Sequence, residues 1–347
     1  MSFTSNLRQL SEAIGVSGDE RAVREIVLRT IEDHVDEVRV DTIGNVLAIK
    51  KARGKAKLRV MLDAHMDEIG LMIVGANDDG TLQFRPIGGI DDRILPGKVV
   101  LIGPDKIPGV IGLPPIHLSR GDMTVKKFDA LAIDIGASSR DQAIGAVRVG
   151  HTATFNTHYR SLGAIVSGKA FDDRAGCAVL IEILQQPRLS NDILAAFTVQ
   201  EEVGLRGARV AAYALEPDAA IAIDATPAND LPPSIEKDVN PNTRLGDGPA
   251  IYISTRGSVS DPRLVKHAID VAARGKIPYQ IRQPGGGGTD MGGIIPTRSG
   301  VPGISISVPT RYLHAPVGLL QVSDARHTID LVRQTVAHLT PKTLRRQ

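Results

Sequence analysis

The sequence is poor in cysteine and in aromatic residues. Of its 347 residues only Cys177 is a cysteine, and aromatic side chains make up 3% of the chain, with no tryptophan. One cysteine cannot form an internal disulfide or a zinc site built from several thiolates, so a metal site here would have to use histidine and carboxylate ligands. The scarcity of aromatic rings argues against a stacking surface for sugars or single-stranded nucleic acid.

The sequence also lacks an excess of charge of one sign, and it has no long apolar run. Lysine plus arginine total 41 and aspartate plus glutamate 39, which gives no reason to expect nucleic acid or an anionic membrane as a partner. No stretch approaches the roughly 18 consecutive apolar residues that a membrane-spanning helix needs. The first twenty residues contain no apolar run of signal-peptide length, so we expect a soluble cytoplasmic protein.

The patterning of the chain changes twice along its length. At 347 residues the chain is long enough for two domains. Helix and strand signals alternate near both ends, which is typical of a sheet covered by helices. Between them, many short strand patterns are separated by Gly, Pro and Asp, with no convincing helix. We therefore predict a helix-covered mixed-sheet α/β domain, residues 1–68 and 161–347, interrupted by a small all-β, barrel-like domain, residues 69–160.

Several local patterns predict individual elements. Ser17 is followed three residues later by Glu20, a capping box that predicts the start of a helix. Asp79-Gly80 lies between two strand patterns and predicts a hairpin turn. Short apolar runs predict buried strands at residues 58–62, 193–200, 219–224 and 303–308.

Acidic residues and histidines follow several of the predicted buried strands. They are His65 and Asp67, Glu201 and Glu202, Asp224, and His314, and Asp172-Asp173 stands in a loop before a predicted helix. Each has an ordinary explanation when taken alone, such as a surface pair, a solvated strand end or a helix cap. Sites in open α/β sheets form outside the carboxyl ends of the strands, so we expect these side chains to converge.

Two histidines and three carboxylates suit two Zn²⁺ or Co²⁺ ions about 3.5–4 Å apart. One carboxylate would have to bridge them, because two cations that close need a shared anion. Of the adjacent Glu201 and Glu202, one can bind a metal while the other acts as general base. The absence of thiolates favours hydrolytic over redox chemistry.

Six sequence blocks, in order along the chain, resemble the signature blocks of TET-type metalloaminopeptidases. That family also includes glutamyl and deblocking aminopeptidases. The blocks are HMDEIG at 65–70, GKAFDDRAG at 168–176, QEEVGLRGA at 200–208, IAIDAT at 221–226, GGGTDMGGI at 286–294 and PTRYLHAPV at 309–317. The resemblance runs from about residue 5 to about residue 335, nearly the whole chain.

The resemblance implies a role for each candidate residue. Asp172 would bridge two metals, Glu201 would be the general base, and Asp67 would orient His65. The pairing of the other ligands with each ion stays open, and the peptide bond between Asp172 and Asp173 is expected to be cis. The implied metal ligands are His65, Asp172, Glu202, Asp224 and His314.

The resemblance also implies an activity and an assembly. The chain would be an aminopeptidase that removes N-terminal residues from peptides with two divalent ions per subunit, zinc or cobalt. Its inserted β domain would make the contacts of a large hollow homo-oligomer, typically a tetrahedral dodecamer.

Two other functions compete with the aminopeptidase. The first is a two-carboxylate glycoside hydrolase, since some family members have been labelled endoglucanases. Such carboxylates face each other across about 5–9.5 Å, which suits adjacent glutamates and scarce aromatic residues poorly. The second is a non-catalytic metal-binding scaffold, and the presence of Glu201 argues against it.

Overall fold

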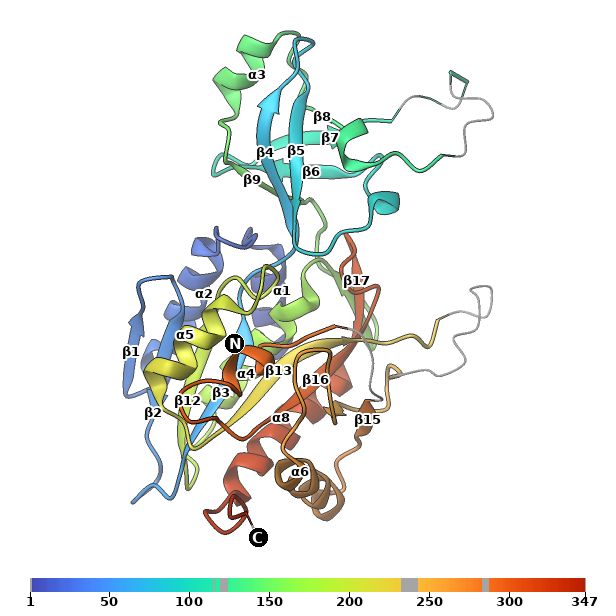
Figure 1. Ribbon diagram of the computed structural model, residues 1–347. Coiled ribbons are helices and arrows are strands. Elements are labelled where there is room, and N and C mark those ends of the chain that lie inside the picture. The colour runs from blue at the N-terminus through green and yellow to red at the C-terminus, as the bar shows by residue number, and fades with distance from the viewer. Residues whose placement is uncertain are drawn as a thin grey trace.

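An α/β body carries a small β barrel that stands on one end of it (Figure 1). The computed structural model describes residues 2–113, 115, 117–118, 124–231, 243–282 and 287–346. The chain leaves the body after strand β3 (Arg59–His65) and returns to it after strand β9 (Thr152–Phe155). The predicted fold class, a helix-covered mixed sheet with an inserted all-β domain, is confirmed.

The body is built on one mixed sheet, which has eleven strands within the described ranges. Its central strands β12, β3, β13 and β16 run parallel to one another, so their carboxyl ends share one edge. Across the sheet the order is β1 (Glu37–Val40), β2 (Val46–Lys50), β12 (Asp192–Thr198), β3, β13 (Ala219–Pro227), β16 (Gly303–Arg311), β17 (Gly318–Gln321), β11 (Ile165–Gly168) and β10 (Arg160–Leu162), with β14 (Ala250–Tyr252) and β15 (Gln280–Arg282) off this path.

Helices cover both faces of the sheet. One face carries α1 (Phe3–Glu12), α2 (Arg21–Ile31), α4 (Phe171–Gln185), α6 (Pro262–Gly275) and α8 (Val322–His338), and the other carries α5 (Arg206–Leu215) and α7 (Met291–Ile294). Two hydrophobic cores lie between these helices and the sheet. Along β3, Val60 and Leu62 pack in the core on the α4 face, whereas Met61 packs in the core on the α5 face. Strands buried on both faces are apolar at nearly every position, which is why the sequence showed them as continuous runs.

The inserted segment forms a closed barrel around its own hydrophobic core. Side chains of its first strand alternate, with Leu71 and Ile73 buried and Met72 and Val74 exposed. Around the barrel the strand order is β4 (Gly70–Ala76), β5 (Leu82–Ile87), β8 (Ile133–Asp134), β7 (Ile107–Ile111), β6 (Val99–Ile102) and β9. The assignment of catalysis to the body and of oligomer contacts to residues 69–160 stays a prediction.

Two local predictions are wrong. The barrel contains a helix, α3 (Arg140–Ala146), which is capped by the Ser139 hydroxyl and is too short to show a clear apolar period. Helix α2 begins at Arg21 without a side-chain cap, so Ser17 and Glu20 do not form a capping box. The Ser17 hydroxyl instead donates a hydrogen bond of 2.6 Å to the carboxylate of Asp67, fifty residues away.

A buried ion cluster connects the barrel to the body. Glu68 lies between β3 and β4 and accepts hydrogen bonds of 2.7 and 2.8 Å from the Lys169 ammonium. It also accepts bonds from the Arg174 guanidinium at 3.3 Å and from the Thr154 hydroxyl of β9 at 3.0 Å. Because both charged partners come from the start of α4 and the residues before it, the cluster fixes the barrel next to the strand ends.

Candidate metal centre

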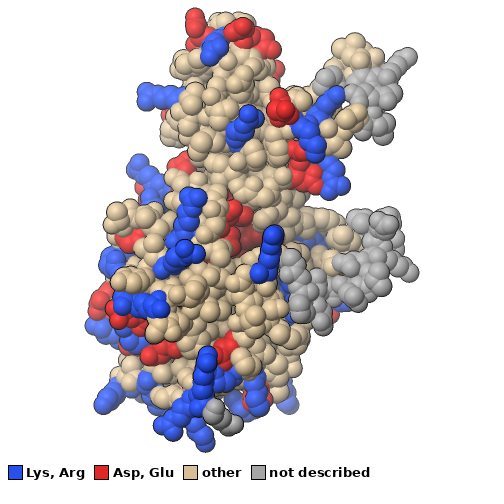
Figure 2. All heavy atoms as spheres, viewed as in Figure 1, with Lys and Arg blue, Asp and Glu red and all other residues tan. Residues whose placement is uncertain are grey.

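The predicted ligands lie at the shared carboxyl edge of the parallel strands. His65 is the last residue of β3, Glu201 and Glu202 follow β12, and Asp224 lies near the end of β13. His314 follows β16, so neighbouring strands supply four of the five predicted metal ligands. The edge lies where the barrel joins the body, and Figure 2 shows acidic side chains in a hollow in this region.

Two groups of side chains could each hold a metal ion. The first, which we call the His65 group, contains His65, Asp172 and Asp224. Nε2 of His65 is 3.1 Å from Oδ1 of Asp172 and 4.0 Å from Oδ1 of Asp224. One possible ligand atom from each of the three residues lies within 4.8 Å of the other two.

The second group, which we call the His314 group, contains Asp172, Glu202 and His314. Nε2 of His314 is 3.3 Å from Oδ2 of Asp172 and 3.4 Å from Oε1 of Glu202. Asp172 therefore belongs to both groups and turns a different oxygen toward each histidine. The two groups pair His65 with Asp224 and His314 with Glu202, the pairing that the sequence left open.

The start of α4 places Asp172 between the two histidines. The peptide bond between Asp172 and Asp173 is cis, as the family resemblance implied. Asp173 turns the other way and accepts hydrogen bonds from the backbone N–H of His65 at 3.2 Å and of Gly176 at 2.9 Å. The adjacent aspartates thus have different partners. Asp172 faces both histidine side chains, whereas Asp173 binds backbone N–H groups.

Both histidines direct Nε2 toward the carboxylates, because Nδ1 is occupied elsewhere. Nδ1 of His65 donates to the backbone carbonyl of Asp67 at 3.2 Å, and Nδ1 of His314 donates to that of Gly89 at 3.0 Å. Metal-binding histidines are commonly held in this way by a partner of the second ring nitrogen. Once Nε2 gives up its proton, each ring would therefore present a lone pair to a cation bound among the carboxylates.

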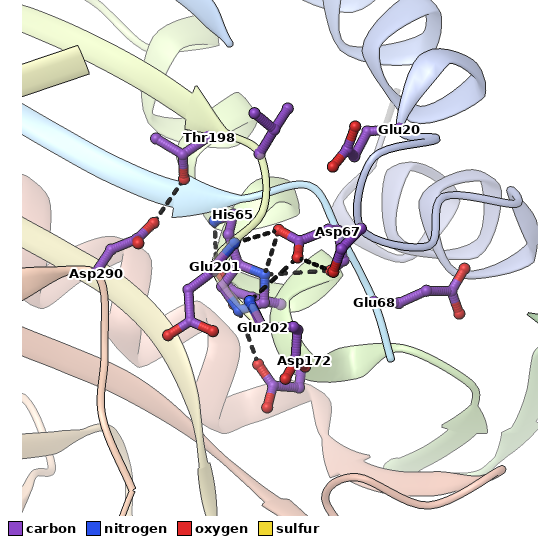
Figure 3. Close-up of polar contacts among 12 residues, drawn as sticks. Glu20, His65, Asp67, Glu68, Asp172, Thr198, Glu201, Glu202 and Asp290 are labelled. Atoms are coloured by element: carbon purple, nitrogen blue, oxygen red, sulfur yellow. Dashed lines mark hydrogen bonds and ion pairs between the residues drawn. The ribbon is translucent and has the colours of Figure 1, made fainter. Parts of the chain in front are cut away.

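The Asp67 carboxylate holds the turn that carries the two glutamates (Figure 3). Its Oδ1 accepts from the backbone N–H of Glu201 at 2.9 Å, and its Oδ2 from that of Glu202 at 3.2 Å. The same carboxylate is 3.6 Å from Nδ1 of His65. Asp67 thus contacts the predicted base, Glu201, and two predicted metal ligands, Glu202 and His65. Its assignment as the residue that orients His65 stays a prediction.

Ser17 was not among the candidate residues, yet its hydroxyl completes this arrangement by donating to Asp67. We expect Ser17→Ala to lower the free energy of unfolding by about 1.5–3 kcal/mol, the usual worth of a hydrogen bond to a charged group. We also expect kcat to fall, because the Glu201–Glu202 turn loses part of its support. Denaturation curves and kinetics test this, with Ser17→Thr, which keeps the hydroxyl, as the control. An alanine variant equal to wild type in both would contradict it.

Crowding of the carboxylates changes their pKa values. Burial, reinforced by the neighbouring acids, raises the pKa of Glu201 to about 8 and that of Glu202 to about 7. Burial would lower the pKa of His314, but its hydrogen bond to Asp172 and the negative charges around it raise the pKa to about 9. Burial also raises the pKa of Asp172, yet hydrogen bonds from both histidines outweigh it and hold that pKa below its usual range.

More buried acids lie beneath the two groups. Asp63 of β3 and Asp290, just before α7, are both buried, and burial together with their mutual repulsion raises the pKa of Asp63. The Thr198 hydroxyl donates to Asp290 at 2.6 Å (Figure 3). Neither aspartate was predicted as a site residue, although an acid within the apolar run before His65 was a visible signal.

The donor set fits divalent cations. Imidazole nitrogens and carboxylate oxygens are ligands that zinc accepts, and imidazole suits several first-row metals. The acids outnumber the two histidines, and an excess of buried negative charge is costly unless it is neutralised. Cations bound in the two groups would supply the positive charge that neutralises these carboxylates.

Known proteins are similar to this chain in sequence and in fold. A family model described as M42 glutamyl aminopeptidase matches residues 44–331. The lysyl aminopeptidase of Pyrococcus furiosus is 35% identical over 345 residues, which cover 96% of this chain and 97% of that protein.

Solved structures of the same kind superpose on nearly the whole chain. An aminopeptidase from the archaeon Desulfurococcus kamchatkensis has a TM-score of 0.93 and 36% identity, over 99% of this chain and 96% of that one. The TET1 peptidase of Pyrococcus horikoshii, which can assemble into a tetrahedron or a large octahedral shell, has a TM-score of 0.87 and 35% identity. That match covers 97% of this chain and 100% of the other.

Proposed function

Because the chain belongs to the M42 glutamyl aminopeptidase family and is an aminopeptidase, we propose that it works with two divalent metal ions, zinc or cobalt. Asp172, His65 and Asp224 would hold one ion, and Asp172, Glu202 and His314 the other. The observation that carries this proposal is the position of Asp172, which faces one histidine with each carboxylate oxygen.

Glu201 is the proposed general base and general acid. Its neighbour Glu202 lies in the His314 group, whereas Glu201 belongs to neither group. Burial favours the neutral form of Glu201 and raises its pKa, and nearby bound cations would oppose that shift, so the side chain could both accept and release a proton. Its backbone N–H is fixed by Asp67.

The residues suggest how a peptide bond is cleaved. Two bound cations would polarise the scissile carbonyl and acidify a water molecule. Glu201 would take a proton from the attacking water and deliver it to the leaving amine. Asp67 would keep Glu201 in reach throughout, and His65 and His314 would stay fixed through their Nδ1 hydrogen bonds.

A small cavity of about 20 Å³, room for little more than a water molecule, lies beside the His314 group. It is lined from the connection to the barrel by Ile69, from the barrel by Phe155, and from the body by Phe171 and Tyr312. The charged pair of Glu68 and Lys169 also lines it. The barrel and the body thus form the cavity together.

Chelation tests the proposal and separates it from its rivals. We expect a panel of aminoacyl-anilides and short peptides to be cleaved by the zinc- or cobalt-loaded protein and not by protein treated with a chelator. Added metal should restore cleavage. A two-carboxylate glycoside hydrolase would survive chelation, and a scaffold would bind metal without cleaving any member of the panel.

We also propose that the chain forms a homo-oligomer through its barrel, with a tetrahedral dodecamer as the expected size. In support, several large apolar side chains of the barrel are exposed, among them Val110, Ile144 and Val149. Within the described residues no helix has both the length and the apolar character to cross a bilayer. The cytoplasmic location stays a prediction.

A further inference from the structure

Two glycines of the barrel reach the candidate metal centre. Gly88 and Gly89 directly follow β5, which ends at Ile87. The carbonyl of Gly89 accepts the 3.0 Å hydrogen bond from Nδ1 of His314, a residue 225 positions further along the chain. A Cβ atom on Gly88 would lie 3.3 Å from Oε2 of Glu202. The barrel therefore lies against both ligands that are specific to the His314 group.

The two histidines are held in different ways. The His65 side chain is only 3% exposed and ends a central strand of the body. The His314 side chain is 38% exposed, lies in a loop after β16 and has a positive φ of 55°. The bond from Nδ1 to Gly89 and the ion pairs of Nε2 with Asp172 and Glu202 are therefore the polar contacts that orient this ring.

The close approach leaves little room for a side chain at either glycine. A Cβ atom on Gly89 would lie 3.1 Å from Nδ1 of His314, so either the ring or the loop would have to move. Gly88 has a φ of 77°, and a Cβ there would also lie 2.8 Å from Cγ2 of Ile69. Gly88 thus needs glycine for its backbone conformation and its contact with Ile69, and a side chain at position 89 would press on the His314 ring.

The barrel that carries these glycines is itself fixed to the body. The Thr152 hydroxyl of β9 donates to Asp19 at 2.6 Å, and the Thr154 hydroxyl donates to Glu68 at 3.0 Å. Both acceptors belong to segments next to the strand ends of the body. The loop at Gly88 and Gly89 therefore keeps a defined position over His314.

We propose that Gly88 and Gly89 are positioning residues through which the barrel sets the geometry of the His314 group. The inserted barrel is then part of the metal centre as well as a separate structural unit. The His314 group depends on the contact between the barrel and the body. The His65 group does not, because His65 and Asp224 lie in β3 and β13 of the body. This inference rests on the proposed metal site.

Metal titration of the full-length protein tests the inference directly. Co²⁺ would be added to chelator-treated protein and followed by visible absorption and calorimetry. Wild type is expected to bind two ions, and Gly89→Ala to bind one with unchanged affinity and the second about 10–100-fold more weakly. Gly145→Ala is the matched control, because it adds the same methyl group in α3 of the barrel with nothing within 4 Å.

Equal affinities for both ions in Gly89→Ala and wild type would overturn the inference and leave the metal site intact. A wild type that binds fewer than two ions would overturn the metal site, and the inference with it.

Hydrogen exchange on wild type gives a second test that needs no variant. Saturation with the second equivalent of Co²⁺ is expected to slow amide exchange in peptides covering residues 87–94 together with those covering 311–317. Unchanged exchange in residues 87–94 would contradict a contact that depends on the filled His314 group. This readout remains available even if Gly89→Ala does not fold.

Discussion

Replacing Glu201 with glutamine is expected to lower kcat by about 10²–10⁴-fold while both metal ions remain bound. General acid–base catalysis by a positioned side chain contributes a factor of this size, and glutamine keeps the shape of the side chain but cannot accept the proton. Glu201 is not a member of either metal-binding group. Loss of activity without loss of metal is therefore the signature of its role.

Kinetics on an aminoacyl-anilide and metal analysis of the same sample provide the measurement. Glu216→Gln is a suitable control, because Glu216 is exposed and pairs with Arg298 on the surface at the end of α5. It should keep wild-type kcat and metal content. Substantial activity in Glu201→Gln would mean that another group moves the proton.

Replacing Asp172 with alanine is expected to abolish the binding of both ions and all turnover above that of chelator-treated protein. Asp172 contributes one oxygen toward each histidine, so its loss removes a ligand from both groups at once. Asp224→Ala is the informative comparison. Asp224 belongs to the His65 group alone, so that variant should still bind one ion through the His314 group.

Metal stoichiometry, measured after gel filtration in buffer with a small excess of Zn²⁺ or Co²⁺, distinguishes the two variants. The expected values are no ion for Asp172→Ala and one for Asp224→Ala. The same stoichiometry in both variants would contradict the shared position of Asp172. Thermal unfolding of each variant shows whether the protein is still folded when metal is lost.

The arrangement of the site along the sheet could be predicted because it depends on short-range patterns. His65, Asp224 and the two glutamates each stand at or just beyond the end of an apolar run, and such runs in an α/β chain are central strands. Parallel strands bring their carboxyl ends to one edge. The barrel could also be predicted, because many short strand patterns separated by Gly, Pro and Asp follow one another in residues 69–160.

The contacts that hold the ligands in place could not be predicted in this way. Ser17 meets Asp67 across 50 positions, and Gly89 meets His314 across 225. No local pattern encodes such pairs, because they depend on how the barrel and the N-terminal segment pack against the strand ends. The local pattern around Ser17 even indicated a helix cap, whereas the hydroxyl bonds to a buried carboxylate.

The most direct test of the two-metal account is a crystal structure of the Co²⁺- or Zn²⁺-loaded protein with anomalous data collected at the metal edge. Two anomalous peaks are expected, one between Asp172, His65 and Asp224 and the other between Asp172, Glu202 and His314. A single peak, or two peaks that do not share Asp172, would contradict the central role assigned to that residue.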